Sequence, residues 1–292
     1  MSGAPLRWSA LGRDIAGLSW GPATGRKILA LHGWLDHADS FSVLAPLLSG
    51  CHVVAVDKPG HGDSAHRPPD GSYNLWDDLR PLFGVMDALE WEGCTLLGHS
   101  RGAMTATLMA AARPDRVDAL LCYDAMLPSP VADADFVSQL RKHLDDMARL
   151  SKRPKRVYAD TRAFLRRRMD YGNSEAVARA LANRALRPVE GGYAVCADPR
   201  LQAASAVKMN DGQIDAVLSA LDMPVLSLWA ADGLGQTAWA KEIQKRARKH
   251  VRRLETDTVP GDHHGHLDLA HARGLADRIL RFLADYPAAN TS

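Results

Sequence analysis

A serine between two glycines is the residue of this chain best placed to act as a nucleophile. The segment Gly98–Gly102 (G-H-S-R-G) follows the apolar run Cys94–Leu97 and precedes Ala103–Ala110, which is rich in helix formers. A glycine two residues to either side of a serine leaves room for a sharp strand-to-helix turn, which exposes the hydroxyl and directs the next N–H toward it. The pattern alone is weak, but its context predicts Ser100 as a nucleophile rather than part of an ordinary glycine-rich turn.

A serine nucleophile needs a base, and the histidine-rich segment Val259–Leu267 (V-P-G-D-H-H-G-H-L) offers one. This segment lies in a predicted loop between the last strand and a terminal helix. We predict His263 as the base rather than His264 or His266, because it follows the glycine turn directly. Three histidines in four residues also suggest a metal site, but no second Cys/His cluster accompanies them. Exposed loop histidines without a role are the other alternative.

Two aspartates could orient this histidine, and both fit the chain order Ser, Asp, His. Asp124 ends one predicted strand and Asp232 ends the next. The acid commonly follows the later strand in a G-x-x-D turn, but residues 230–233 read A-A-D-G, so Asp232 comes one residue early. We favour Asp124 and keep Asp232 as the alternative; whichever is not used would be an ordinary turn aspartate.

The oxyanion of an acyl-transfer reaction needs two N–H donors. His32-Gly33-Trp34 follows the apolar run Ile28–Leu31, and its glycine permits a turn that directs the N–H of Trp34 toward the site. The N–H of Arg101 is the second predicted donor. Such donors contribute on the order of 3 kcal/mol each to stabilisation of the transition state.

Apolar runs without alternation predict strands buried on both faces, hence a mostly parallel sheet flanked by helices. The runs are Ile28–Leu31, Val53–Val56, Thr95–Leu97, Ala119–Tyr123 and Val225–Trp229. An antiparallel edge ribbon over 7–21 and a last strand over 252–259 complete the predicted α/β sheet. Helices are predicted over about 40–49, 73–92, 101–112, 236–250 and 268–284.

The segment 127–221 interrupts this alternation, and we predict that it is a helical cap or lid with little strand structure. Residues 1–126 and 222–292 then form the core. A segment inserted there would lie over the carboxyl ends of the strands, where ligands of open α/β sheets bind. Its basic clusters, between Arg141 and Arg168, predict solvated helix faces, with an arginine that holds an anionic substrate group as the alternative.

Composition narrows the classes of function. The 292 residues carry 36 basic and 34 acidic side chains, a net charge of +2, which gives no argument for nucleic-acid binding. We find no window of 18 apolar residues and no secretory signal pattern. Cys51, Cys94, Cys122 and Cys196 form no C-x-x-C pair, so we expect reduced, structural thiols in a cytoplasmic protein.

Four motifs together resemble an α/β-hydrolase: His32-Gly33-Trp34, D-x-P-G-H-G at 57–62, G-H-S-R-G at 98–102 and Gly261-x-His263. More narrowly, H-G-W-L-D at 32–36, with G-G-Y at 191–193 and D-P-R-L at 198–201, is similar to the serine hydrolase-like family. The resemblance implies a Ser/acid/His triad, a helical lid and no cofactor. In that family the strand before the cap often ends in an acid while the later turn often lacks one. This pattern supports Asp124, and Asp232 departs from it.

We therefore expect a soluble, carboxylesterase-like serine hydrolase that acts on a small acyl substrate without a cofactor. A carboxylic ester is the first expectation; a lactone, a thioester or a carbon–carbon bond next to a ketone would use the same groups. Ser100 argues against the chemistry of haloalkane dehalogenases and epoxide hydrolases, because resemblance to those enzymes would call for an aspartate at this position. The rival hypothesis is a ligand-binding protein that keeps the fold without turnover.

Overall fold

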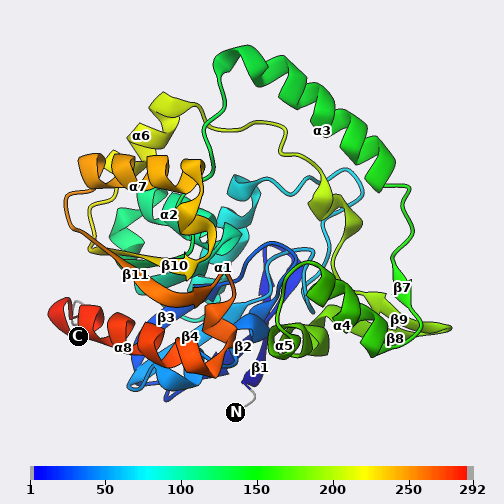
Figure 1. The fold of residues 1–292 in the computed structure, drawn as a ribbon, viewed down its shortest axis with the longest axis horizontal. Helices are drawn as coiled ribbons and strands as arrows, with labels where there is room; N and C mark the ends of the chain where they lie inside the picture. Colours follow the sequence, from blue (N-terminus) through cyan, green and yellow to red (C-terminus); the bar gives the residue numbers. More distant parts are fainter. Residues whose placement is uncertain (1–2, 288–292) are drawn as a thin grey trace.

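The computed structural model describes residues 3–287, and its centre is an eight-stranded sheet of order β1-β2-β4-β3-β5-β6-β10-β11 (Figure 1). β1 and β2 form an antiparallel ribbon, and β2 is antiparallel to β4; the other neighbours are parallel. The strands are β1 Ala4–Ala10, β2 Arg13–Trp20, β3 Arg26–Leu31, β4 Cys51–Val56, β5 Cys94–His99, β6 Val117–Tyr123, β10 Val225–Asp232 and β11 Leu254–Asp262. Residues 1–2 and 288–292 of the predicted core lie outside the described residues.

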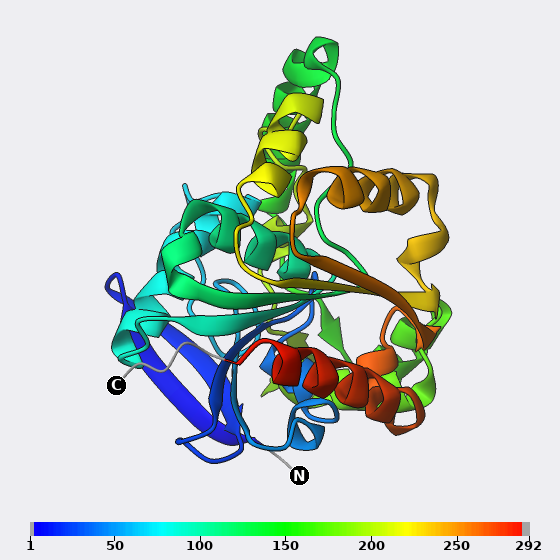
Figure 2. The same cartoon turned by 90° about the vertical axis from the view of Figure 1, so that its left-hand side faces the viewer.

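Helices cover both faces of this sheet, as the unalternating apolar runs require. One apolar cluster joins the sheet to α1 Leu79–Ala88, α2 Arg101–Ala112, α6 Asp211–Ser219 and α7 Ala238–His250. A second cluster joins the opposite face to α8 Leu269–Asp285 and to the 3₁₀ turns η1 Ala38–Phe41 and η2 Ala45–Leu47. Figure 2 shows α7 and α8 on opposite sides of the sheet. The predicted α/β architecture is confirmed.

Two predicted helices are shorter or of another type than expected. The 40–49 segment forms η1 and η2 rather than an α-helix, and Pro46 lies at the start of η2, where its lack of an N–H costs nothing. The 73–92 segment begins with the 3₁₀ turn η3 Leu75–Asp78, because the Asp77 carboxylate accepts the N–H of Asn74. It ends early, as Glu90 adopts a left-handed φ of 57°.

The segment between β6 and β10 contains three short strands as well as helices, and the predicted helical cap did not include these strands. β7 Val157–Tyr158, β9 Gly192–Val195 and β8 Leu186–Val189 form a three-stranded antiparallel sheet. Gly191 and Gly192 have φ of 80° and 139°, which lets the chain reverse tightly between β8 and β9. The helices of this segment are α3 Phe136–Leu150, α4 Thr161–Asp170, α5 Glu175–Ala185 and α6.

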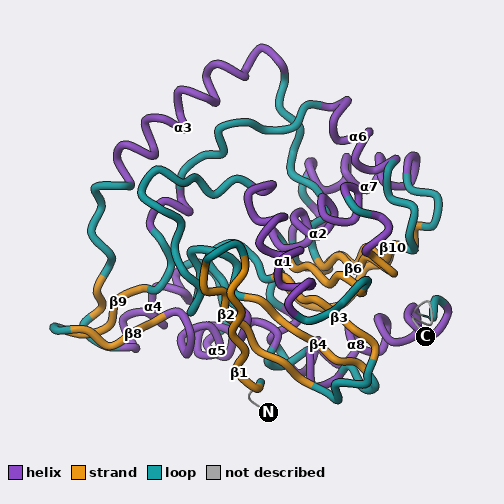
Figure 3. Tube along the Cα trace, turned by 180° about the vertical axis from the view of Figure 1, so that it is seen from behind, coloured by secondary structure: helices purple, strands orange, loops and turns teal. Residues whose placement is uncertain are grey.

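These helices differ in how they meet the core. α3 stands away from the sheet (Figures 1 and 3), and α5 packs against η1 and the 3₁₀ turn η8 Gly265–Leu267. α6 packs against α2 and α7, and its Ile214 and Leu218 belong to the larger apolar cluster. We therefore propose a cap that ends near Met209 rather than at residue 221. Within residues 3–287, no helix combines the length and apolar character needed to cross a membrane.

Candidate active site

The turn from β5 to α2 holds Ser100 in a strained conformation. Its φ and ψ are 53° and −123°, outside the regions that most residues with a side chain adopt. A Cβ on Gly98 would overlap the backbone of Ala103, and one on Gly102 would overlap the carbonyl oxygen of Leu31. The turn can therefore pack against β3 and α2 only with glycine at both positions. This is the physical basis of the sequence pattern around the serine.

His263 lies between the serine and an aspartate. Its Nε2 is 3.0 Å from Ser100 Oγ, and its Nδ1 is 2.7 Å from Asp124 Oδ2. The backbone carbonyl of His263 also lies 2.8 Å from Nε2 of the buried His99, which ties the loop after β11 to the end of β5. The structure thus brings the predicted nucleophile, base and favoured acid into one hydrogen-bonded row.

Of the two candidate acids, Asp124 is the one beside His263. It follows β6 with a left-handed φ of 51° and is fully buried. Its carboxylate accepts N–H groups from Ala230 at 3.1 Å and Leu234 at 2.9 Å, so its position is set by the end of β10. Asp232 ends β10 with an exposed side chain.

The other two histidines of the loop have different surroundings from His263. His264 Nε2 lies 3.5 Å from Asp36 Oδ2. His266 is fully buried against the rings of Phe41, His99 and Tyr123. Over residues 3–287, no group of three His, Cys, Asp or Glu side chains is arranged to hold a metal ion.

The residues of the two predicted oxyanion donors line one cavity together with Ser100. Trp34 lies in the loop after β3, where Leu35 has a left-handed φ of 58°. Arg101 is the first residue of α2, and N–H groups in the first turn of a helix have no partner within the helix. The Arg101 side chain turns away from the serine and donates to the carbonyl of Tyr73 at 2.7 Å. Its backbone N–H, not its charge, is therefore the group available to the site.

Two cavities meet at Ser100 and Trp34. The first, of about 520 Å³, is lined by His263 and by β7, α4 and the segment 153–156. The second, of about 500 Å³, is lined by Arg101, Met104 and Met209, and by side chains of α3. The Trp34 indole N–H donates to the carbonyl of Leu201 at 2.8 Å, so its ring is held where the two cavities meet.

An ion pair that sequence reasoning missed joins α4 to the loop that carries Trp34. Arg168 lies 3.1 Å from Oδ1 of the buried Asp36, whose other oxygen faces His264. Burial acts to raise the pKa of Asp36, but His264 and Arg168 outweigh it and hold this pKa well below its usual range. The signals in the sequence are the aspartate of H-G-W-L-D and the basic run at 166–168.

The D-P-R-L motif has a structural role. Asp198 accepts from the hydroxyl of Tyr73 at 2.9 Å and from Arg200 at 2.7 Å, and its N–H donates to the carbonyl of Gly60. Burial opposes ionisation, but hydrogen bonds from His66, Arg200 and Tyr73 hold the pKa of Asp198 well below its usual range. These contacts fasten the segment before the 3₁₀ turn η6 Pro199–Gln202 to the loop after β4.

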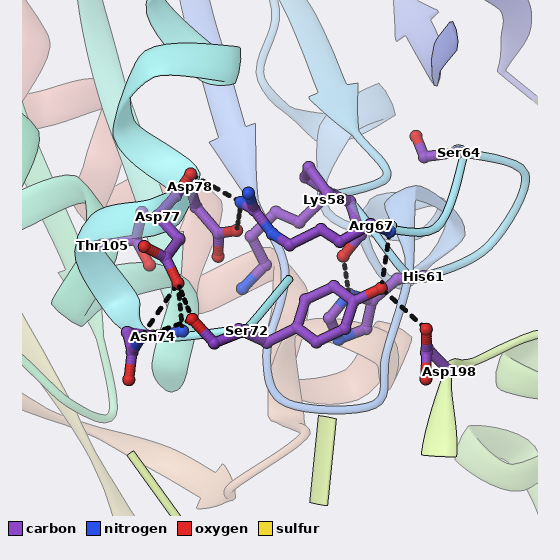
Figure 4. Close-up of polar contacts among 12 residues, drawn as sticks. Lys58, His61, Ser64, Arg67, Ser72, Asn74, Asp77, Asp78, Thr105 and Asp198 are labelled. Carbon is purple, nitrogen blue, oxygen red and sulfur yellow. Dashed lines mark hydrogen bonds and ion pairs between the residues drawn. The ribbon is translucent and has the colours of Figure 1, made fainter. Parts of the chain in front are cut away.

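A buried lysine in this loop was also missed. Lys58 is fully buried, and its Nζ has no hydrogen-bond partner among residues 3–287. Its side chain points toward Asp78 (Figure 4), and burial lowers its pKa to about 7. The only signal in the sequence is its place within D-x-P-G-H-G.

Comparison with known proteins agrees with this architecture. Residues 27–267 match the family described as the alpha/beta hydrolase fold. A "Serine hydrolase-like protein" of Danio rerio is 32% identical over 90% of this chain and 82% of its own length. The crystal structure of a hypothetical protein from Pseudomonas aeruginosa PAO1 is similar with a TM-score of 0.90 and 34% identity, covering 96% of this chain and 99% of that one. The thioesterase domain from the curacin biosynthetic pathway is similar with a TM-score of 0.81 and 25% identity, covering 96% and 100% of the two chains. The chain therefore belongs to the α/β-hydrolase superfamily and, within it, to the serine hydrolase-like family.

Proposed function

We propose that this protein is a cofactor-independent serine hydrolase that cleaves a carboxylic ester or thioester through an acyl-enzyme. The observation that carries the proposal is the row Ser100–His263–Asp124, with distances of 3.0 and 2.7 Å, at the meeting point of two cavities. A nucleophile, a base and a group that orients the base are the parts that acyl transfer needs.

In the first step, Ser100 Oγ attacks the acyl carbon while His263 Nε2 takes the hydroxyl proton. The N–H groups of Trp34 and Arg101 hold the negative oxygen of the tetrahedral intermediate. The bond to the leaving group then breaks, and His263 gives its proton to the departing alcohol or thiol. Asp124 keeps Nδ1 protonated and stabilises the imidazolium that forms between these proton transfers.

In the second step, water attacks the acyl-enzyme, and His263 takes its proton. The serine–acyl bond breaks, the proton returns to Ser100, and a carboxylic acid leaves. The thioesterase name of the curacin domain is the reason to place thioesters beside esters as substrates. Lactones and carbon–carbon bonds next to a ketone remain further candidates for the same groups.

The competing proposal is a ligand-binding protein without turnover. A fluorophosphonate probe separates the two, because it bonds covalently to an activated serine. We expect labelling of the wild-type protein and of Asp232→Asn, and none of Ser100→Ala. Hydrolysis of p-nitrophenyl butyrate by the wild type, at least 100-fold above Ser100→Ala, is the matching kinetic result. If the folded wild-type protein neither labels nor hydrolyses activated esters, the ligand-binding proposal replaces this one.

A further inference from the structure

Four cationic side chains line the first cavity without a carboxylate partner. Among residues 3–287, no acidic oxygen lies within 4.0 Å of Arg153, Lys155, Arg156 or Arg167. Arg153 instead contacts the amide oxygen of Gln202. The guanidinium of Arg156 lies 5.1 Å from the ring centre of Tyr158, and Arg167 donates to the hydroxyl of Tyr171. These contacts orient the cations and leave their charge uncompensated.

The carboxylates that line the same cavity are already paired. Asp36 forms an ion pair with Arg168 at 3.1 Å, and Asp198 forms one with Arg200 at 2.7 Å. The four remaining cations therefore set the sign of the field in this cavity. Apolar side chains, among them Phe164 and Val195, line it as well. Arg153, Lys155 and Arg156 are exposed, so this field acts at the solvent-facing part of the cavity, where it raises the local concentration of anions.

The position of His263 indicates which part of the substrate lies in the positively charged first cavity. His263 lines the first cavity and is not among the residues that line the second. In acyl transfer the histidine protonates the leaving group, so the leaving group must lie on the histidine side. The second cavity holds Arg101, a proposed oxyanion donor, with apolar Met104 and Met209 for the acyl chain. Of its other cations, Lys142 and Arg149 are paired with Asp146, which leaves Lys208 alone against four such cations in the first cavity.

We infer that the substrate is an acyl ester or thioester whose leaving group is a phosphorylated alcohol or thiol, bound through its phosphate by Arg153, Lys155, Arg156 and Arg167. This inference rests on the proposed function and adds the leaving group to it. A phosphate is favoured over a single carboxylate because it carries close to two negative charges at neutral pH and accepts several charge-assisted hydrogen bonds. In the reaction the acyl C–O or C–S bond breaks, the proton of Ser100 passes through His263 to the leaving oxygen or sulfur, and the phosphate stays intact.

Two pairs of substrates, matched except for phosphate, test this. One is 1-butyrylglycerol 3-phosphate against 1-butyrylglycerol; the other is butyryl-4′-phosphopantetheine against butyryl-pantetheine. We expect kcat/KM at least tenfold higher for the phosphorylated member of one pair or both, mainly through KM. This ratio should fall several-fold between 20 and 500 mM NaCl, because salt screens exposed charges over about 10 Å at 0.1 M. The pair with the larger ratio distinguishes an oxygen from a sulfur leaving group.

Variants of the cations give an independent readout. The triple variant Arg153→Gln/Lys155→Gln/Arg156→Gln, and separately Arg167→Gln, should lower the ratio of phosphorylated to neutral kcat/KM several-fold. Lys152→Gln and Arg166→Gln are the matched controls, since both are exposed cations next to the first set but do not line the cavity. These controls should keep the wild-type ratio.

Several results would overturn the inference. Equal kcat/KM within both pairs would contradict the proposed anion-binding site. A preference for the phosphorylated substrates that does not change with salt concentration would contradict it as well. If the ratio of phosphorylated to neutral kcat/KM falls equally in Lys152→Gln and Arg166→Gln, the effect comes from the net charge of the protein and not from a specific site. A gain for p-nitrophenyl hydrogen succinate over p-nitrophenyl butyrate that the triple variant abolishes would put the anion on the acyl side instead. If the neutral esters are hydrolysed without any phosphate preference, or if p-nitrophenyl butyrate is hydrolysed and none of the four compounds is, only this inference fails. If p-nitrophenyl butyrate is not hydrolysed either and the fluorophosphonate probe does not label, the proposed function fails with it.

Discussion

The carboxylate of Asp124 occupies the space that a side chain at Gly233 would fill. A Cβ built on Gly233 would overlap Asp124 Oδ2, and the N–H of the next residue, Leu234, donates to that oxygen at 2.9 Å. The turn after β10 therefore holds a carboxylate that comes from β6. This explains why residue 233 is glycine where a G-x-x-D turn would place an acid. A carboxylate beside His263 can therefore come from residue 124 or from residue 233, but not from both.

Gly233→Ala tests this relationship. The added methyl group must displace Asp124 from His263, so we expect kcat for p-nitrophenyl butyrate to fall about 10- to 100-fold, since small displacements of catalytic groups cost rates of that order. Gly274→Ala on α8, where the added methyl group meets no atom within 4 Å beyond the backbone of its own helix and its chain neighbours, is the control and should keep wild-type activity. Unchanged kcat in a folded Gly233→Ala protein would contradict the proposed role of Asp124.

The choice of acid can be measured directly with Asp124→Asn and Asp232→Asn. An asparagine at residue 124 cannot hold the histidine in the required tautomer, so we expect kcat to fall by about 10³ to 10⁴. The exposed Asp232 should tolerate the change within about twofold. Steady-state kinetics with one activated ester decide between them, and a larger loss at Asp232 would reverse the assignment.

Lys58 predicts an unusual dependence of stability on alkaline pH. Burial lowers its pKa from 10.5 to about 7, so between these values the unfolded chain binds a proton that the native protein does not. The free energy of unfolding should therefore rise as pH increases from about 7 to about 10. The fall in pKa corresponds to about 5 kcal/mol at most.

Lys58→Met should remove most of this rise and stabilise the protein at pH 7. Urea unfolding at pH 7 and pH 9.5 measures it, with the exposed Lys249→Met on α7 as the control that keeps the wild-type slope. Equal slopes for wild type and Lys58→Met would show that Lys58 titrates normally.

The ion pair of Arg168 with Asp36 should appear in a double-mutant cycle. Arg168→Met leaves a buried carboxylate without its guanidinium partner and with only His264 beside it, so we expect a loss below the roughly 3–5 kcal/mol of a fully unpaired buried charge. In Arg168→Met/Asp36→Asn the negative charge is gone as well, so we expect the double variant to recover at least half of that loss. Urea unfolding of all four proteins gives the coupling energy; strictly additive losses would mean that the pair is not coupled.

Features that depend only on residues close together in the chain could be predicted from the sequence. Gly98 and Gly102 are required by the packing of a single turn, so the position of Ser100 at the strand–helix junction could be read from a few residues. The apolar runs predicted a parallel sheet because a strand covered on both faces needs apolar residues at every position. The histidine loop was readable because Gly261, with a left-handed φ of 109°, turns the chain just before His263.

Side chains that look alike in the sequence could be told apart only in the folded chain, by their neighbours in space. Asp124 and Asp232 lie at the carboxyl ends of two strands that are neighbours in the sheet, and only Asp124 lies 2.7 Å from the histidine. Likewise, nothing local separates Arg168, which is paired with Asp36, from Arg167, whose charge has no acidic partner within the described residues. Pairing depends on carboxylates more than a hundred positions away in the chain. Hydrogen bonds and ion pairs act over a few ångströms in space, so only the folded chain determines which charges they join.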